Sequence, residues 1–160
     1  MPLILADTTV LNNFAQVRRP DLLRRAFSGL SAPMEVRDEL AAGELKGLVP
    51  ICDWSWLTLI ELTDAERVRA AELRGSAGIG EAACLAVLVA QGGLLLTDDG
   101  PARRLAAALG VELSRTIGVL IKLLRRKDIT LEQGDALLQE MIDRGYRSPV
   151  RSLREVIADF

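Results

Sequence analysis

The stretch that decides the fold is LILAD at residues 3–7, in which four apolar residues run directly into an acid. A second stretch of the same kind, LLLTDD, occupies residues 94–99. Short continuous apolar runs are typical of strands buried on both faces of a parallel sheet. Because each run ends on aspartate, each expected strand presents carboxylates at its carboxyl end.

Helix signals separate the two expected strands and follow the second. Thr63 and Glu66 form a capping box that predicts a helix to about residue 74, and Thr130 with Gln133 predicts one over 131–144. Asp21 is expected to N-cap a helix over 22–27. Other helices are expected at 10–16, 34–42 (ended by Gly43), 81–91, 101–109, 117–126 and 149–158, and other strands at 56–60 and 111–113. This alternation predicts an α/β fold with a parallel sheet, right-handed crossovers and a helical C-terminal extension.

Length and composition bound the function. A chain of 160 residues predicts a single domain, and the absence of histidine excludes Ser-His and Cys-His catalytic pairs and nearly every zinc site. Cys52 and Cys84 stand apart in the sequence and are expected to be buried free thiols. No apolar run reaches the roughly 18 residues that span a bilayer, and no signal peptide is apparent, so we expect a cytoplasmic protein without membrane contact.

The charge is unevenly distributed. The formal net charge of −2 argues against nucleic-acid binding by bulk charge. Between residues 101 and 127, however, there are seven basic residues and only one acidic residue, Glu112. This stretch is either an ordinary solvated helix surface or a local positive face for an anionic substrate.

The acids at the two strand ends point to a shared site. Ligands of open α/β sheets bind outside the carboxyl ends of the strands, where the strand order reverses. If the two strands are neighbours, Asp7 and the pair Asp98-Asp99 share one crevice. Clustered carboxylates there raise one another's pKa or bind a divalent cation such as Mg²⁺ or Mn²⁺. Each acid also has a plain structural explanation, because Asp7 suits a helix N-cap and Asp98-Asp99 suit a turn.

The order of the acids resembles that of the PIN-domain nuclease family, which includes the VapC-type toxin ribonucleases. The matching pieces are residues 3–11, 32–40, 78–83, 95–99 with 102–103, and a piece at 115–120 that is similar to a PIN subfamily of mostly uncharacterised proteins. The resemblance covers about residues 3–124. It implies a three-layer α/β/α fold with a central parallel sheet of about five strands, in which the first and fourth strands are adjacent. Residues 125–160 would then be C-terminal helices of the same domain, 1–160.

The resemblance also assigns roles to individual residues. The catalytic metal ligands would be Asp7, Glu39, Glu81 and Asp99, with Asp98 as a further candidate ligand and Thr9 in support. The RNA backbone would be held by Arg103, Arg104, Arg115 and Lys122. Taken alone, Glu39 suits a solvated helix position. Glu81 suits the first turn of a helix, where the helix dipole stabilises an acid. Because residues leaving a strand alternate in direction, only one of the two adjacent aspartates is expected in the crevice. The resemblance to the family motif favours Asp99 as that ligand, and Asp98 is then expected to cap the following helix.

Two functions from different classes follow. The first is a metal-dependent endoribonuclease of PIN type, the toxin of a toxin–antitoxin module, with an antitoxin protein and a second copy of the chain as expected partners. The apolar positions of residues 10–16 and 36–45, with Trp54 and Trp56, are either an antitoxin groove or core. The second function is a binding or assembly module with little or no nuclease activity.

Overall fold

A five-stranded parallel sheet forms the centre of the structure, a computed structural model that describes residues 2–157. Its order is β3-β2-β1-β4-β5. The strands are β1 (Leu3–Ala6), β2 (Ser31–Pro33), β3 (Thr58–Ile60), β4 (Gly93–Leu96) and β5 (Glu112–Ser114). β1 pairs with β4 along its whole length, from Leu3 opposite Gly93 to Ala6 opposite Leu96. The two strands that end on aspartate are therefore neighbours, and the strand order reverses between them.

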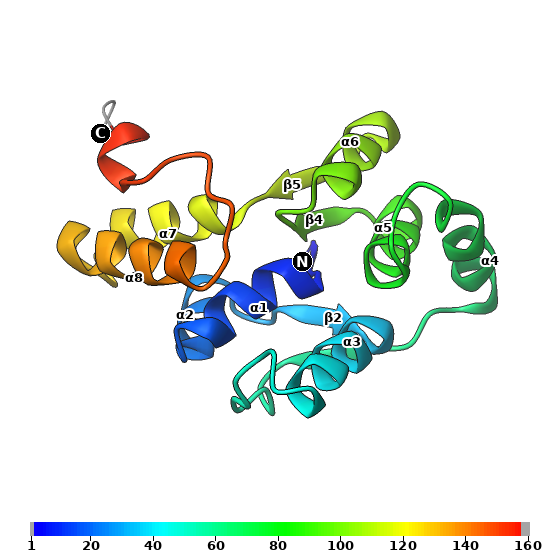
Figure 1. The fold of residues 1–160 in the computed structure, drawn as a ribbon. Coiled ribbons are helices and arrows are strands. Elements are labelled where there is room, and N and C mark those ends of the chain that lie inside the picture. Colours follow the sequence, from blue (N-terminus) through cyan, green and yellow to red (C-terminus); the bar gives the residue numbers. More distant parts are fainter. Residues whose placement is uncertain (1, 158–160) are drawn as a thin grey trace.

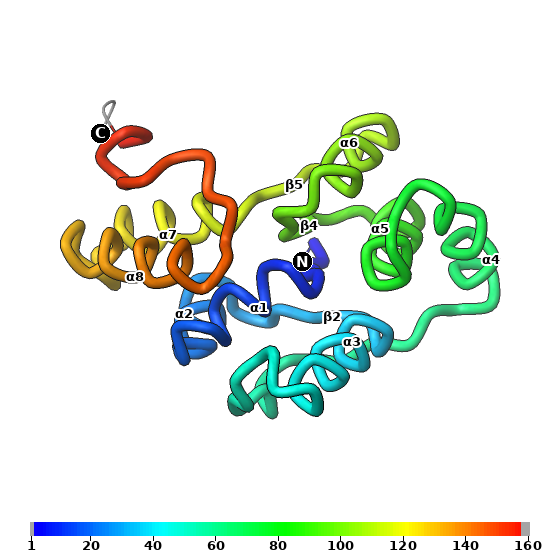
Figure 2. The backbone as a smooth tube through the Cα atoms, in the orientation of Figure 1, coloured from blue at the N-terminus to red at the C-terminus, as the bar shows by residue number. Residues whose placement is uncertain are grey.

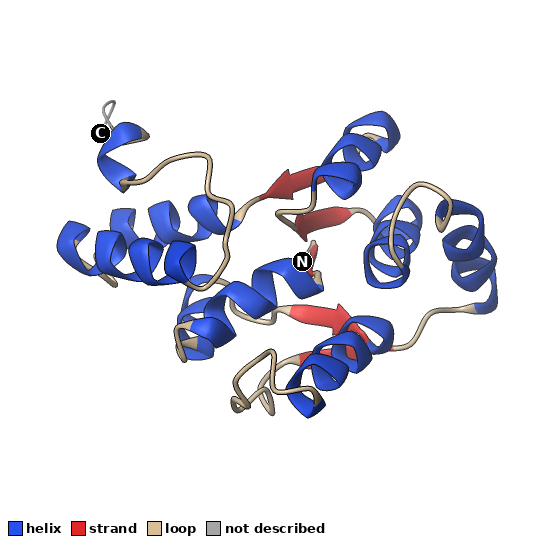
Figure 3. Ribbon diagram, viewed as in Figure 1, coloured by secondary structure: helices blue, strands red, loops and turns tan. Residues whose placement is uncertain are grey.

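Helices cover both faces of this sheet (Figures 1 and 3). One layer contains α1 (Thr8–Gln16), α2 (Pro20–Ala26), α3 (Met34–Leu45), α7 (Thr116–Arg125) and α8 (Leu131–Asp143). The other contains α4 (Asp64–Leu73), α5 (Ile79–Gln91) and α6 (Gly100–Leu109). Right-handed crossovers produce this division, because the chain moves one way across the sheet up to β3 and the other way afterwards. The expected three-layer α/β/α fold is confirmed.

The core lies between the sheet and the two helical layers. Leu5, Leu95, Phe14 and Leu120 are fully buried in it. Of the apolar positions in residues 10–16 and 36–45, those up to residue 40 belong to this core together with Trp54, and Trp56 packs against it, whereas Leu45 is exposed. Cys84 is buried as a free thiol, while Cys52 is free but only partly buried. No helix within residues 2–157 combines the length and apolar character needed to cross a membrane.

Two expected helix boundaries are wrong. α3 continues through Gly43 to Leu45, because a Cβ at Gly43 would lie 2.8 Å from Val49 Cγ2 and this glycine allows close packing rather than ending the helix. α2 begins at Pro20 with Arg19 as its N-cap residue, and Asp21 pairs with Arg19 at 3.1 Å instead of capping. The three-residue strand β2 was not expected, because SAP carries no strand signal on its own.

The expected helix over 149–158 is also wrong within the described residues; its last residue lies outside them. Only a 3₁₀ turn, Leu153–Glu155, forms there, because Ser152 and Glu155 make a capping box of their own. Ser148 accepts a hydrogen bond from Val150 N at 3.2 Å and holds the preceding segment in an open turn. Figure 2 traces this segment from α8 through a long loop to the short turn near the C-terminus.

Candidate active site

Asp7 lies at the junction of β1 and α1 and is fully buried. Its Oδ1 accepts hydrogen bonds from Thr9 N at 3.0 Å, Thr9 Oγ1 at 2.5 Å and Val10 N at 3.3 Å. Its Oδ2 accepts from the hydroxyl of Thr97, at the end of β4. Asp7 is thus an N-cap, as the plain structural explanation predicted, but its second oxygen faces the neighbouring strand.

Glu39 reaches the same edge from α3 and joins two other helices. Its Oε1 accepts from Gly80 N in the first turn of α5 at 2.6 Å, and its Oε2 accepts from Thr8 Oγ1 at 3.2 Å. A Cβ at Gly80 would lie 2.5 Å from Glu39 Oε1. Glycine at this position therefore allows the carboxylate to approach the start of α5.

The charges at this edge repel one another. Burial raises the pKa of Asp7 to about 7, and the nearby Glu81 carboxylate contributes to the rise. Burial also raises the pKa of Glu81, with Glu39 and Asp99 adding to it. Among the ion pairs of residues 2–157, none involves Asp7, Glu39, Glu81 or Asp99. Four acids therefore share one end of the sheet without an ion pair to a basic side chain of the described residues.

The adjacent aspartates diverge, as strand alternation predicted, but with different roles from those expected. Asp99 Oδ2 accepts from Ala102 N at 2.9 Å and N-caps α6. Asp98, expected to be that cap, turns instead toward α7. Its Oδ1 accepts from Thr116 N at 3.2 Å and Tyr146 OH at 3.1 Å, and its Oδ2 accepts from Thr116 Oγ1 and from Asn13 Nδ2 at 3.2 Å.

The Asp98 carboxylate is thus the centre of a polar junction between α1, α7 and the loop after α8. Arg115 Nε lies 3.7 Å from Asp98 Oδ1, and only 8% of the Asp98 side chain is exposed. Burial and the Asp98 carboxylate together raise the pKa of Tyr146, so the phenol remains a hydrogen-bond donor. With its oxygens so fully bonded, Asp98 fits a structural role better than a ligand role.

The Asp98→Asn substitution is expected to reduce the free energy of unfolding by roughly 2–4 kcal/mol, because an amide places an N–H₂ group against donors that now bond to a charged oxygen. The Asp99→Asn substitution should cost about 1 kcal/mol or less, since an asparagine side chain can still cap a helix. Urea unfolding of both variants measures the difference. A smaller loss for Asp98→Asn than for Asp99→Asn would contradict this role for Asp98.

Comparison with known sequences identifies the family. A sequence model described as a PIN domain matches residues 3–160, nearly the whole chain. The chain belongs to the PIN-domain family. No curated protein matches it at a significant level. PIN domains are generally nucleases and typically bind divalent metals.

The donor set of this PIN domain is of the type that suits a hard divalent cation, because it offers carboxylate and hydroxyl oxygens without imidazole. Within residues 2–157, no three acids or thiols are already arranged to hold a metal ion. Each carboxylate instead accepts from a local donor where one is near: Asp7 from threonine hydroxyls, Glu39 from Gly80 N and Asp99 from Ala102 N. Carboxylates of like charge are expected to keep apart in this way until a cation draws them together.

The basic residues divide into two groups. A Cβ at Gly100, next to Asp99, would lie 3.4 Å from Arg104 Nη1 and 4.0 Å from Arg103 Nη2, so both guanidinium groups lie over the start of α6. Arg115 reaches the edge too but is paired with Asp98. Lys122 lies in the last turn of α7 with its Nζ 4.0 Å from the Phe27 ring centroid, and burial lowers its pKa. The structure does not bring Lys122 to the acidic edge.

Several polar residues at this edge were missed in the sequence. Thr97 and Thr116 are fully buried and bond to Asp7 and Asp98, respectively. Thr97 follows a buried strand directly, which was a usable signal. Asn13 and Tyr146 carried no signal, because only the folded chain brings residues 85 and 48 positions away to Asp98.

Proposed function

We propose that this PIN domain is a metal-dependent endoribonuclease that hydrolyses RNA phosphodiesters. The observation that carries the proposal is the convergence of Asp7, Glu39, Glu81 and Asp99 on the carboxyl edge of β1 and β4, where none of them forms an ion pair with a described basic side chain. Burying repelling carboxylates is costly unless a cation or a proton compensates them. A site of this kind is better explained by metal binding than by stability.

The residues of the chain would divide the work as follows. Asp7, Glu39, Glu81 and Asp99 would hold Mg²⁺ or Mn²⁺, which when bound supplies a water of lowered pKa and neutralises charge at the phosphate. Thr9 and Thr97 fix the orientation of Asp7 through their hydroxyls. Arg103 and Arg104, at the N-terminus of α6, place positive charge where an RNA phosphate would approach. Arg103 Nε is buried without a hydrogen-bond partner among the described residues, so this donor is available to bind an anion such as a phosphate.

Chelation tests the proposal directly. EDTA is expected to abolish cleavage of single-stranded or structured RNA, Mg²⁺ or Mn²⁺ to restore it, and Zn²⁺ to substitute poorly. Cleavage assays on labelled RNA, with Mn²⁺ calorimetry in parallel, give both readouts. Full activity in excess chelator would contradict the metal mechanism. Neither cleavage nor Mn²⁺ binding would favour the second function, a PIN fold that only binds or assembles.

We further propose that this ribonuclease is the toxin of a toxin–antitoxin module. Its partners would be an antitoxin protein and a second copy of the chain, and its location would be the cytoplasm. Exposed apolar side chains that would support such contacts lie at the end of α3 and in the segment that follows it, where Leu45, Leu48 and Ile51 are 90%, 67% and 78% exposed. A short neighbouring gene with a DNA-binding N-terminus would support the toxin role. Light scattering of the purified protein tests the homodimer.

A further inference from the structure

A small polar pocket adjoins the acidic edge on the side of the C-terminal loop. Its volume is about 220 Å³, and it is lined by Thr9, Asn12, Asn13, Asp98, Tyr146 and Arg147. Thr9 belongs to both places, because its hydroxyl donates to Asp7 Oδ1 at 2.5 Å and accepts from Asp98 N at 2.9 Å. A molecule in this pocket would therefore lie beside whatever the carboxylates hold.

The amide of Asn13 has an orientation fixed by its neighbours. Its Nδ2 donates to Asp98 Oδ2 at 3.2 Å and to Thr116 Oγ1 at 3.1 Å. The opposite orientation would turn the amide oxygen toward a carboxylate and lose both bonds. Asn13 Oδ1 accepts no hydrogen bond from residues 2–157. It is a positioned acceptor that no protein donor uses.

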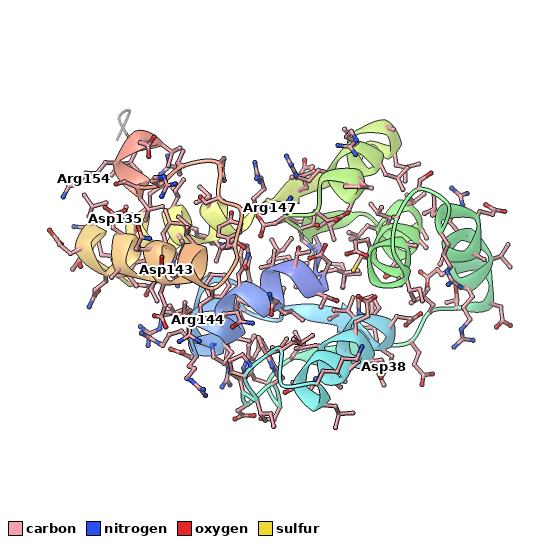
Figure 4. The ribbon with its side chains drawn as sticks, in the orientation of Figure 1. Asp38, Asp135, Asp143, Arg144, Arg147 and Arg154 are labelled. Carbon is pink, nitrogen blue, oxygen red and sulfur yellow. The ribbon has the colours of Figure 1, made fainter. Side chains whose placement is uncertain are left out.

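Asn12 and Arg147 supply the complementary groups. Asn12 Oδ1 accepts from Gln16 Nε2 at 3.1 Å, which leaves Nδ2 as a donor without a partner in the described chain. Arg147 is exposed and makes no ion pair with residues 2–157. Figure 4 shows Arg147 at the C-terminal loop near the sheet, whereas Arg144 lies lower in the view, below the end of α8. The pocket thus combines an acceptor, a donor and a cation.

We propose that this pocket binds one unstacked RNA base beside the phosphate that is cleaved, and so sets the sequence preference of the enzyme. Proteins read RNA sequence mainly from unstacked bases, through hydrogen bonds to base edges and stacking on aromatic or guanidinium groups. Asn13 Oδ1 and Asn12 Nδ2 bond to the base edge, and Arg147 contacts the adjoining phosphate or the face of the base. The identity of the ligand as RNA rests on the proposed function; the arrangement of the pocket does not.

Binding in EDTA separates the pocket from catalysis. Labelled hexamers of A, C, G and U are titrated by fluorescence anisotropy with the full chain, under conditions in which the proposed reaction does not proceed. The wild type is expected to prefer one base by at least about threefold, as one or two net hydrogen bonds allow, and Asn12→Ala to remove most of that preference. Arg147→Ala should weaken all four complexes about fivefold and reduce the slope of log affinity against log salt by about 1.

Arg144→Ala is the matched control, because it removes the same charge three residues away and outside the pocket. It should change affinity by less than about twofold. Thermal melts confirm that each variant is folded, and cleavage with Mn²⁺ is measured separately. If the wild type cleaves RNA without base preference, the proposed base-binding role of the pocket is wrong and the proposed nuclease function is retained. Base preference with an Arg147 effect but no cleavage overturns the nuclease instead. Equal effects of Arg147→Ala and Arg144→Ala, or no RNA binding, overturn the pocket.

Discussion

Asp7→Asn is expected to lower RNA cleavage by at least about a hundredfold, the upper end of the roughly 10- to 100-fold loss that follows a change outside the direct ligands of a metal site. The substitution removes a charged ligand oxygen while preserving the shape of the side chain. It also removes a buried charge that burial and Glu81 disfavour, so the metal-free variant should remain folded at pH 8. The measurements are initial cleavage rates with Mn²⁺, Mn²⁺ calorimetry and thermal melts.

Asp38→Asn is the matched control for this experiment. Asp38 is exposed on α3, next to Glu39 in sequence, and Figure 4 shows it on the outer side of the molecule. Its substitution changes the net charge by the same amount and should leave cleavage and Mn²⁺ affinity nearly unchanged. Retention of full cleavage by Asp7→Asn would remove Asp7 from the site, whereas equal losses in both variants would indicate an effect of net charge alone.

The central elements could be predicted because their signals are local. An apolar run that ends on aspartate marks β1 and β4, and each capping box at Thr63 and Thr130 fixes a helix start by hydrogen bonds within four residues. Adjacency of β1 and β4 came from the family resemblance, and the structure confirms it. The convergence of Asp7 with Asp99 follows from that adjacency, because parallel strands present their carboxyl ends at one edge.

What could not be predicted depends on contacts between distant segments. The helix cap was assigned to Asp98, whereas Asp99 caps α6, because both aspartates suit a cap in sequence and only the positions of Thr116 and Tyr146 draw Asp98 away. Lys122 was grouped with the RNA-binding residues by charge, yet the packing of α7 against α2 places it over Phe27. The helix expected in the C-terminal segment does not form, because Ser148 and Ser152 make local hydrogen bonds and Tyr146 bonds to Asp98.

The contribution of Asp7 to the stability of the metal-free protein is expected to fall as the pH rises from about 4 to about 8. Asp7 has a pKa of about 7 in the folded state against an ordinary value of 3.8. Below the lower value both states are protonated, and the contribution of Asp7 to stability is fully present. Between the two values the unfolded chain releases a proton that the folded state keeps, so the free energy of unfolding falls with rising pH. The whole difference is on the order of 4 kcal/mol.

Comparison of wild type with Asp7→Asn isolates this effect. Other acids, such as Asp21 and Glu66, have lowered pKa values and act in the opposite direction, but they contribute equally to both proteins and cancel in the difference. Urea unfolding of each protein at several pH values gives the free energy of unfolding of the wild type minus that of Asp7→Asn. This difference should decline between about pH 4 and 8. Added Mn²⁺ should restore wild-type stability at pH 8 and leave Asp7→Asn unchanged, because a ligand that binds only the folded state stabilises it once its concentration exceeds its Kd. A difference curve that is flat with pH would show that Asp7 is already ionised without strain, and the repulsion that motivates a metal at this edge would then be absent.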